Sequence, residues 1–183
     1  KTLWSKTDMS NLRLINETEI TSQTSSITVT DLFNEDFDIY KIVVDDINMN
    51  ATAGIRGRIR FVNTSGSVVT SSNYDYAVQQ LHSFQAFGEN KATNGSTIDY
   101  FTIDIENTAE GNGGVIYIFN PYSSSSYTFL LFQTSFYNEG SGGQSQKGIG
   151  VLKQTSSIGG INFTAHSGDI DSLSLKTYGL RVD

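Results

Sequence analysis

Cysteine is absent from this chain of 183 residues, and proline and tryptophan occur once each. Without cysteine there is no disulfide framework and no thiolate metal site, which excludes the small cystine-stapled secreted domains. No apolar run approaches the roughly 20 residues of a membrane-spanning helix, and no signal-peptide core is visible. We therefore expect a protein made in a reducing cytoplasm, with no cofactor, that is stabilised by packing alone.

Charge is also scarce, since charged residues make up 17% of the chain and the formal net charge is −7. An acidic protein repels nucleic-acid phosphates and anionic membranes. The one basic cluster consists of Arg56, Arg58 and Arg60. We therefore expect neither a nucleic-acid partner nor a membrane partner.

The residues that are plentiful favour strands and hairpin turns. Nine Tyr and eleven Phe suit strands, and seventeen Gly together with many Asn suit tight turns. At this length one domain with a sizeable core is expected, which would bury roughly 70% of the unfolded surface.

Two stretches carry the clearest strand pattern. The stretch 37–47 (FDIYKIVVDDI) has apolar residues on both parities, and Asp45 and Asp46 mark the point where it should leave the core. The stretch 55–62 (IRGRIRFV) alternates cleanly, with Ile59 and Phe61 directed inward and the three arginines outward.

Further strands are expected wherever apolar or β-branched residues alternate between turn signals. These are 12–15, 20–33, 68–69, 77–87, 98–105, 115–119, 127–137, 150–153, 161–165 and 173–180. Helix competes with strand over 77–87, and the two Gly- and Asn-containing stretches 88–96 and 138–150 are expected to be loops. The pattern predicts an all-β fold: a single antiparallel, jelly-roll-like β-sandwich of about nine to eleven strands over residues 12–183, preceded by an N-terminal arm at 1–11.

Catalytic and metal-binding motifs are not apparent. His82 and His166 have no metal ligand at i+2 or i+4, and no nucleophile elbow is present. Pairs of carboxylates occur at 36/38, 45/46, 99/104 and 169/171, but turn caps and solvated strand edges account for such pairs. Asp169 and Asp171 could offer oxygens to Ca²⁺, although they lack the spacing of a calcium loop. We expect no catalytic residue, no metal and no enzymatic activity.

Candidate contact residues are aromatic or cationic. Trp4 either attaches the arm to the core or anchors it on a neighbouring subunit. The arginines either form a solvated face with acidic cross-strand partners or bind an anionic glycan or an acidic neighbour. The loop tyrosines either pack at strand ends or stack on sugar rings. The candidates for glycan or subunit contact are Trp4, Arg56, Arg58, Arg60, Tyr74, Tyr76, Tyr122 and Tyr137.

Several segments together resemble one known group of proteins. They are the acidic strand start at 33–43, the arginine-rich strand at 55–61, SSNYDY at 71–76, IFNP at 118–121, SGDI at 167–170 and YGL at 178–180. Over roughly residues 12–180 the chain resembles a virion-protein module that recurs in tailed bacteriophages of marine bacteria and cyanobacteria. The matching motifs are structural, and none carries a catalytic residue.

The resemblance implies a non-enzymatic structural protein on the exterior of a phage particle, made in the host cytoplasm. It would serve as a capsid-decoration or fibre module, bind other capsid or tail proteins, and form a homo-oligomer. The alternative is a carbohydrate-binding module at a tail-fibre tip, which would recognise host-surface glycans through the loops 120–126 and 138–146.

Overall fold

The computed structural model describes residues 11–50, 56–103, 112–138 and 142–180. These residues form twelve strands and no helix: β1 (Leu12–Ile20), β2 (Ser26–Val29), β3 (Ile39–Asn50), β4 (Arg56–Asn63), β5 (Tyr74–His82), β6 (Gly88–Gly95), β7 (Ile98–Ile103), β8 (Gly113–Phe119), β9 (Thr128–Asn138), β10 (Gly142–Leu152), β11 (Ile158–Ala165) and β12 (Asp169–Leu180). The predicted all-β class is confirmed, and the strand count slightly exceeds the expected range. Because the described residues contain no helix, none of them forms a helix long and apolar enough to cross a membrane.

Eight of the strands form a jelly roll. Four antiparallel pairs are nested along the chain: β1 with β12, β2 with β11, β3 with β8, and β4 with β7. The chain passes back and forth between two sheets, so that β1, β12, β3 and β8 lie in one sheet and β2, β11, β4 and β7 in the other. The predicted jelly-roll-like sandwich is therefore the observed fold.

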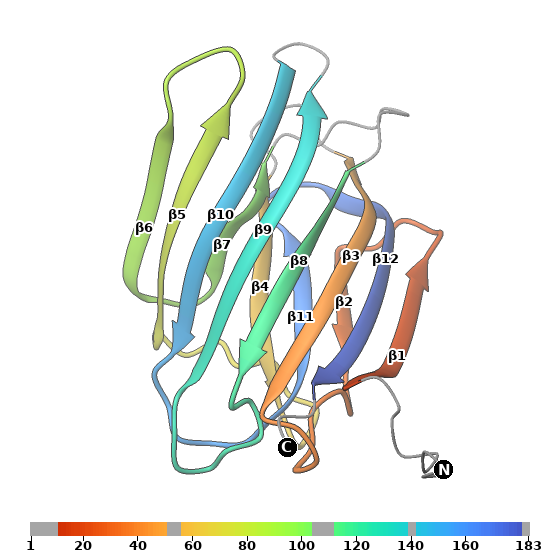
Figure 1. The fold of residues 1–183 in the computed structure, drawn as a ribbon, viewed down its shortest axis with the longest axis vertical. Coiled ribbons are helices and arrows are strands. Elements are labelled where there is room, and N and C mark those ends of the chain that lie inside the picture. Colours follow the sequence, from red (N-terminus) through yellow and green to blue (C-terminus); the bar gives the residue numbers. More distant parts are fainter. Residues whose placement is uncertain (1–10, 51–55, 104–111, 139–141, 181–183) are drawn as a thin grey trace, which may run out of the picture.

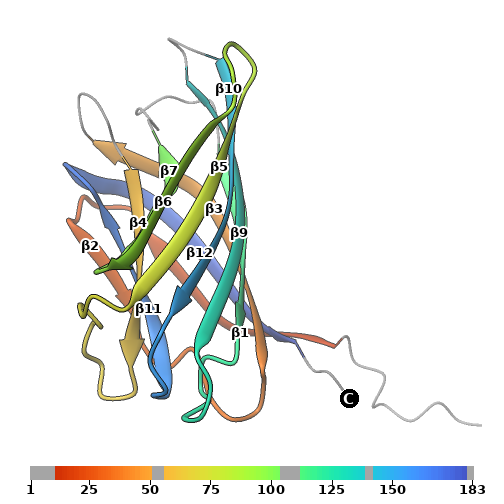
Figure 2. The ribbon, with the colours of Figure 1, turned by 90° about the vertical axis from the view of Figure 1, so that its left-hand side faces the viewer.

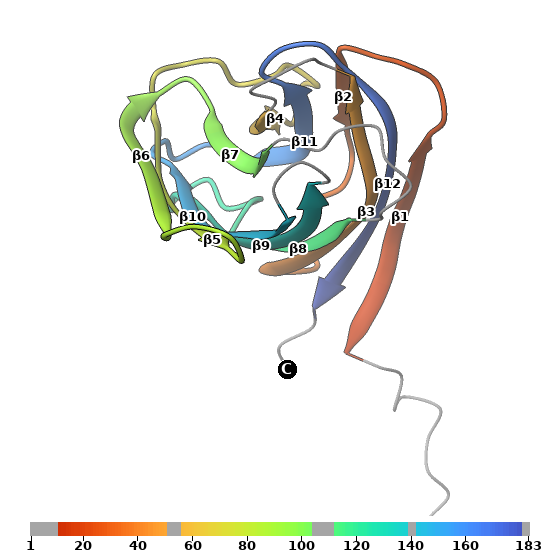
Figure 3. The same ribbon diagram turned by 90° about the horizontal axis from the view of Figure 1, so that it is seen from above.

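Two further hairpins widen one sheet only. The hairpin β5–β6 is inserted between β4 and β7, and β9–β10 is inserted between β8 and β11. Together they extend the first sheet to eight strands in the order β1-β12-β3-β8-β9-β10-β5-β6, as Figure 1 shows. Seen from the side and from above, this wide sheet curves around the four-stranded one (Figures 2 and 3).

The core lies between the two sheets and follows the period of two. In β4, Gly57, Ile59 and Phe61 are buried while the arginines between them are partly exposed, as predicted. In β9, Leu130 and Phe132 point inward. Each such side chain contributes about 1.5–3 kcal/mol of transfer free energy, so the inner faces hold the sheets together.

Strand β3 runs further than its sequence indicated. Asp45 and Asp46 were expected to end it, but the strand continues to Asn50, and Ile47 and Met49 are buried beyond the acidic pair. Asp46 has a positive φ of 50°, and the pairing register between β3 and β12 shifts nearby. The two aspartates therefore mark a bulge within the strand, and the expectation that they end it is wrong.

Two stretches expected to be loops are strands, β6 and β10. The inward positions of β10 hold Gln144, Gln146 and Gly148 in place of apolar residues, which removed the hydrophobic period from the sequence. A Cβ at Gly148 would lie 2.3 Å from the Phe132 ring, so glycine leaves room for that ring. The composition of this stretch therefore gave no strand pattern, although its backbone pairs with β9 on one side and with β5 on the other.

Smaller boundary differences affect three other predicted strands. The segment from Tyr74 to His82 is a strand, so the helix that the sequence offered as an alternative does not form there. Val68 forms an isolated bridge with Val62 and does not begin a strand. The strand expected over 20–33 is the shorter β2.

Candidate functional site

The outer face of the eight-stranded sheet carries two adjacent rows of mostly apolar side chains. The cross-strand registers align one row through Leu12, Leu180, Ile39, Phe119, Phe129, Val151 and Asp75. They align the next row through Leu14, Tyr178, Lys41, Tyr117, Leu131, Ile149, Ala77 and Lys91. We call the uncharged members of these two rows the apolar band.

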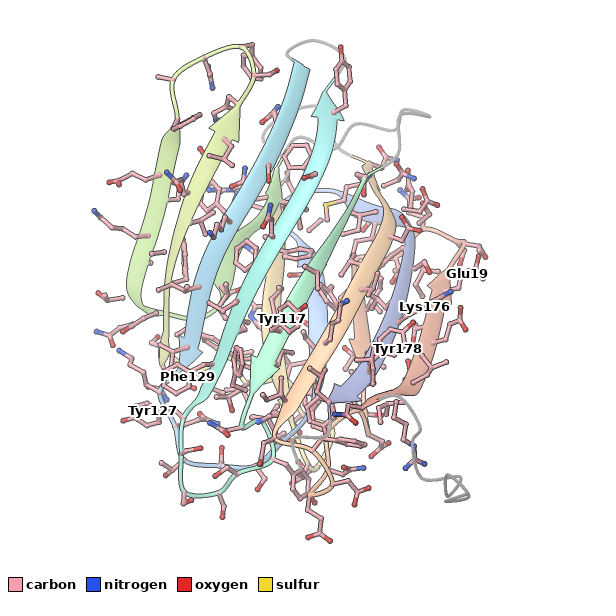
Figure 4. The ribbon with its side chains drawn as sticks, viewed as in Figure 1. Glu19, Tyr117, Tyr127, Phe129, Lys176 and Tyr178 are labelled. Atoms are coloured by element: carbon pink, nitrogen blue, oxygen red, sulfur yellow. The ribbon has the colours of Figure 1, made fainter. Side chains whose placement is uncertain are left out.

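The exposed large residues of the apolar band lie on the inserted hairpin β9–β10 and on β1, where Leu14 is 51% exposed. Phe129 and Leu131 are each 46% exposed, and Ile149 is 55% exposed. A groove of about 810 Å³ lies over these residues, with Phe119 on one side and Ala77 on the other. In Figure 4, which looks onto this face, Tyr117, Phe129 and Tyr178 extend across it.

The next two rows of the same face are mostly polar. The next row contains Glu17, Lys176, Gln133, Lys147, Gln79 and Glu89, together with Val43 and Val115. Lys176 Nζ lies 3.0 Å from Glu17 Oε1, and this bond raises the pKa of Lys176. The row after it includes Ser135 and Ser145. The outward residues of one strand therefore belong to an apolar part of the face near one end and to a polar part further along.

The outer face of the four-stranded sheet is basic. Arg58 Nε lies 3.3 Å from Asp99 Oδ1, and Arg60 Nε donates to the carbonyl of Ser96 at 2.9 Å. Arg56 lies over the Tyr100 ring, 4.7 Å from its centroid, and donates to the Tyr100 hydroxyl. Within the described part of the chain, one of the three arginines therefore has an acidic partner.

His166, at the end of β11, lies between two of these arginines. An NH₂ group of Arg56 is 2.8 Å from its Nε2, and an NH₂ group of Arg58 contacts its Nδ1. Its backbone N–H also donates to the Arg56 carbonyl, which fixes it beside β4. Partial desolvation and the positive charges of Arg58 and Arg56 lower the pKa of His166 below its ordinary value. The imidazole is therefore neutral near pH 7.

Tyr76 and Tyr100 border this cluster. Both are partly buried against the core. Burial and the nearby charge of Asp99 raise the pKa of Tyr76. Tyr100 has a positive φ of 62°, an uncommon conformation for an aromatic residue, and its N–H donates to Asp99 Oδ1 at 3.2 Å. The structure thus brings together three predicted contact residues, Arg56, Arg58 and Tyr76.

Tyr74 is not a surface contact, and its inclusion among the candidates is wrong. It is fully buried and stacks on Phe61. Its hydroxyl accepts from the Phe61 N–H and donates to the Val69 carbonyl, each at 3.0 Å. Burial raises its pKa to about 12. The residue is a core tyrosine whose polar end is satisfied internally.

The remaining aromatic candidates are separated. Trp4 lies outside the described residues. Tyr122 is exposed in the β8–β9 loop, whereas Tyr137 is exposed near the other end of β9. Because β9 has eleven residues and a strand rises about 3.4 Å per residue, the two tyrosines cannot border one sugar site.

The described residues offer no catalytic arrangement beyond these surfaces. No group of three or more His, Asp or Glu residues among them could hold a metal ion. His82 contacts Phe84 edge-on and lies far from His166 in the sequence. The residues that the sequence did not single out are those of the apolar band. The available signals were the stretches 37–47 and 127–137, which have apolar residues on both parities.

Comparison with known proteins leaves the family open. No protein-family model matches the chain, and no curated protein matches it. Among solved structures, an infectious bursal disease virus VP2 subviral particle gives a TM-score of 0.16 at 11% identity, covering 94% of this chain and 41% of that one. The structure of the Gt strain of the same virus gives 0.14 at 9% identity, covering 92% and 41%. These TM-scores do not establish a shared fold, and the chain spans well under half the length of either structure.

Proposed function

We propose that this chain is a non-enzymatic structural subunit on the exterior of a virus particle, and that two copies pack face to face through the apolar band. The observation that supports this most is the exposure of Phe129, Leu131 and Ile149 on one continuous sheet face. The virion setting and the phage origin rest on the resemblance of the sequence to phage virion modules. Exterior decoration or fibre proteins need an interaction surface, and no catalytic residue.

The size of the apolar band fits a protein interface. The uncharged members of the two rows lie on seven strands, so a spacing of about 4.8 Å and two rows give a projected area of about 29 Å by about 14 Å, or about 400 Å². That lies within the range of the largest apolar patches on monomers, about 300–600 Å², and such patches are often functional. A standard interface buries roughly 800 Å² on each partner, so the band forms its apolar centre and the adjacent polar row forms its rim.

A second copy is the occupant that this geometry favours. Face-to-face sheet packing requires a partner whose sheet face is also apolar, and a two-fold contact buries both bands at once. Lys41 is the sole charged residue in the interior of the two rows, since Asp75 and Lys91 lie on β5 and β6 at one side of the sheet. Asp75 is already paired with Lys153 at 2.8 Å. Self-association therefore brings few like charges together, despite the net charge of −7.

A matched pair of substitutions tests the dimer. Leu131→Asp places a carboxylate in the apolar band, whereas Ser135→Asp places it on the same strand and face within the polar part. By light scattering after size exclusion, we expect a dimer for the unmodified chain and for Ser135→Asp, and a monomer for Leu131→Asp. A monomeric unmodified chain at about 100 µM, well above the Kd of specific dimers, or equal behaviour of the two variants, would reject the proposal.

The virion assignment has its own test. Electron microscopy of particles labelled with an antibody against this chain should place the label on the particle exterior. Particles without label, in which the chain is also undetectable by mass spectrometry, would reject a structural role in the virion while leaving the dimer intact.

A second candidate function is binding of host-surface glycans, and one observation favours it. Tyr117, Phe129 and Tyr178 lie on one sheet face, where aromatic rings could stack on several sugar rings. Glycan-array binding that is lost in Phe129→Ala and kept in Tyr137→Ala would support this function. Binding that is unchanged in Phe129→Ala would exclude this face.

A further inference from the structure

The cluster around His166 contains more hydrogen-bond donors than acceptors. A neutral imidazole has one acceptor nitrogen, and its other nitrogen carries a proton. Guanidinium NH₂ groups from Arg56 and Arg58 approach both ring nitrogens. One of these two contacts therefore sets an N–H against an N–H, whichever tautomer is present. Protonating the ring would remove the remaining acceptor, so His166 cannot satisfy both arginines.

The charges of the cluster are also unbalanced. Arg56 and Arg58 contribute two positive charges, and Asp99 is the one carboxylate that the described residues place against them, through Arg58 Nε. Arg56 Nε is buried and has no acceptor among the described residues. Thr164, the cross-strand neighbour of Arg58, has a buried hydroxyl that likewise has no hydrogen-bond partner among the described residues. Counted over the described residues, the cluster thus has one uncompensated positive charge and several polar groups without a partner.

The cluster is rigidly held, as a binding site requires. Arg56 is held against Tyr100 by its ring contact and by a hydrogen bond to the hydroxyl, and Arg58 is held by Asp99. The backbone of His166 is tied to that of Arg56 at 2.8 Å. Arginines fixed in this way lose little side-chain entropy when they bind an anion.

We propose that Arg56 and Arg58, together with His166, form a binding site for an oxyanion, namely a carboxylate or sulfate group that is either free or carried by a sugar. The anion accepts from the two NH₂ groups that now converge on the imidazole, and it neutralises the excess positive charge. Such charge-assisted bonds are about twice as strong as neutral ones. This site lies on the sheet opposite the apolar band, so it is independent of the proposed dimer.

The test uses the two histidines as reporters. The chain contains only His82 and His166, so its histidine ring signals are readily resolved by ¹H–¹³C NMR. Sodium sulfate, acetate, glucuronate and uncharged glucose are titrated at pH 7.5 and constant ionic strength. We expect saturable shifts of the His166 signals with the three anions, no shift with glucose, and unmoved His82 signals. Glucuronate that binds at least fivefold tighter than acetate identifies a sugar-borne group, and equal affinities identify the free anion.

Arg60 provides the matched control. It lies on the same strand and face, and its Nε is occupied by the Ser96 carbonyl. Arg56→Gln should weaken anion binding at least tenfold, and Arg60→Gln, with the same loss of charge, should change it by less than twofold. If Arg56→Gln does not fold, Arg56→Lys should still weaken binding several-fold, because lysine lacks the planar fork of donors. Absence of a saturable His166 shift, or equal weakening by both Gln variants, would overturn the proposal.

Discussion

The outer face of the eight-stranded sheet carries an apolar surface, whereas the outer face of the four-stranded sheet carries a basic one. On the eight-stranded sheet, apolar side chains cross the strands in register, and the exposed ones lie on β1 and on the inserted hairpin β9–β10. On the four-stranded sheet, arginines alternate with core residues and meet Asp99, Tyr100 and His166. The insertion therefore enlarges the apolar part of one face, which suits contact with a broad apolar partner, while its Gln133 and Lys147 lie in the polar part. The basic face suits a small anion.

The largest expected effect is a difference in unfolding free energy between substitutions in the core and in the apolar band. Phe132 and Phe129 lie on the same strand, but Phe132 is 3% exposed and Phe129 is 46% exposed. Phe132→Ala should lower the free energy of unfolding by about 3–5 kcal/mol, because it leaves a cavity. Phe129→Ala should change the stability of the monomer by less than about 1 kcal/mol. Denaturant unfolding at a concentration where the chain is monomeric measures both, and equal losses would show that the apolar band belongs to the core.

A smaller effect distinguishes the arginines of the basic face. Arg58→Gln leaves the carboxylate of Asp99, whose side chain is 11% exposed, without its guanidinium partner. Because the arginine itself is partly solvated, we expect a loss of about 1–2 kcal/mol, below that for a fully buried pair. Arg60→Gln loses one bond to a backbone carbonyl and should cost less than about 1 kcal/mol.

Thermal or denaturant unfolding of the double variant Arg58→Gln/Asp99→Asn completes the test of the pair. Removing both charges should restore part of the stability lost in Arg58→Gln. A double variant as unstable as the sum of its two single variants would mean that the pair is not coupled.

The smallest expected effect is a pH dependence at the same face. The pKa of His166 is lowered in the folded chain by partial desolvation and by Arg58 and Arg56, against the opposing charge of Asp99. Below about pH 6.5 the unfolded chain therefore binds a proton that the folded chain resists, and this contribution to stability falls as the pH drops. Unfolding measured between pH 7.5 and pH 5.5 should depend less on pH in His166→Asn than in the unmodified chain. A slope unaffected by His166→Asn would contradict the assignment.

The sequence predicted those features that local periodicity encodes. The alternation of 55–62 correctly placed the arginines outside and Ile59 and Phe61 inside. β10 was not predicted because Gln144, Gln146 and Gly148 occupy its inward positions in place of apolar residues. Glycine at 148 leaves room for the Phe132 ring. Tyr74 was assigned to the surface because it follows a polar stretch, although its hydroxyl finds its partners inside the core.

The two candidate surfaces depend on registers that no local pattern contains. The apolar band exists because seven strands align their outward residues, and three of those strands come from the two insertions. His166 joins Arg56 and Arg58 only because β11 pairs with β4 across about a hundred residues of chain. The arginines themselves were visible in the sequence, but their convergence on one imidazole was not.

The central claim, that the apolar band is buried between two copies, is tested most directly by thiol reactivity. The chain has no cysteine, so Ile149→Cys provides a unique thiol in the band, and Lys147→Cys provides one on the same strand and face outside it. Alkylation rates are compared at concentrations below and well above the dimer dissociation constant. We predict that the thiol at 149 reacts at least fivefold more slowly at high concentration, while the thiol at 147 reacts equally fast at both. Equal rates at 149 under both conditions, in a chain that dimerises, would contradict the claim.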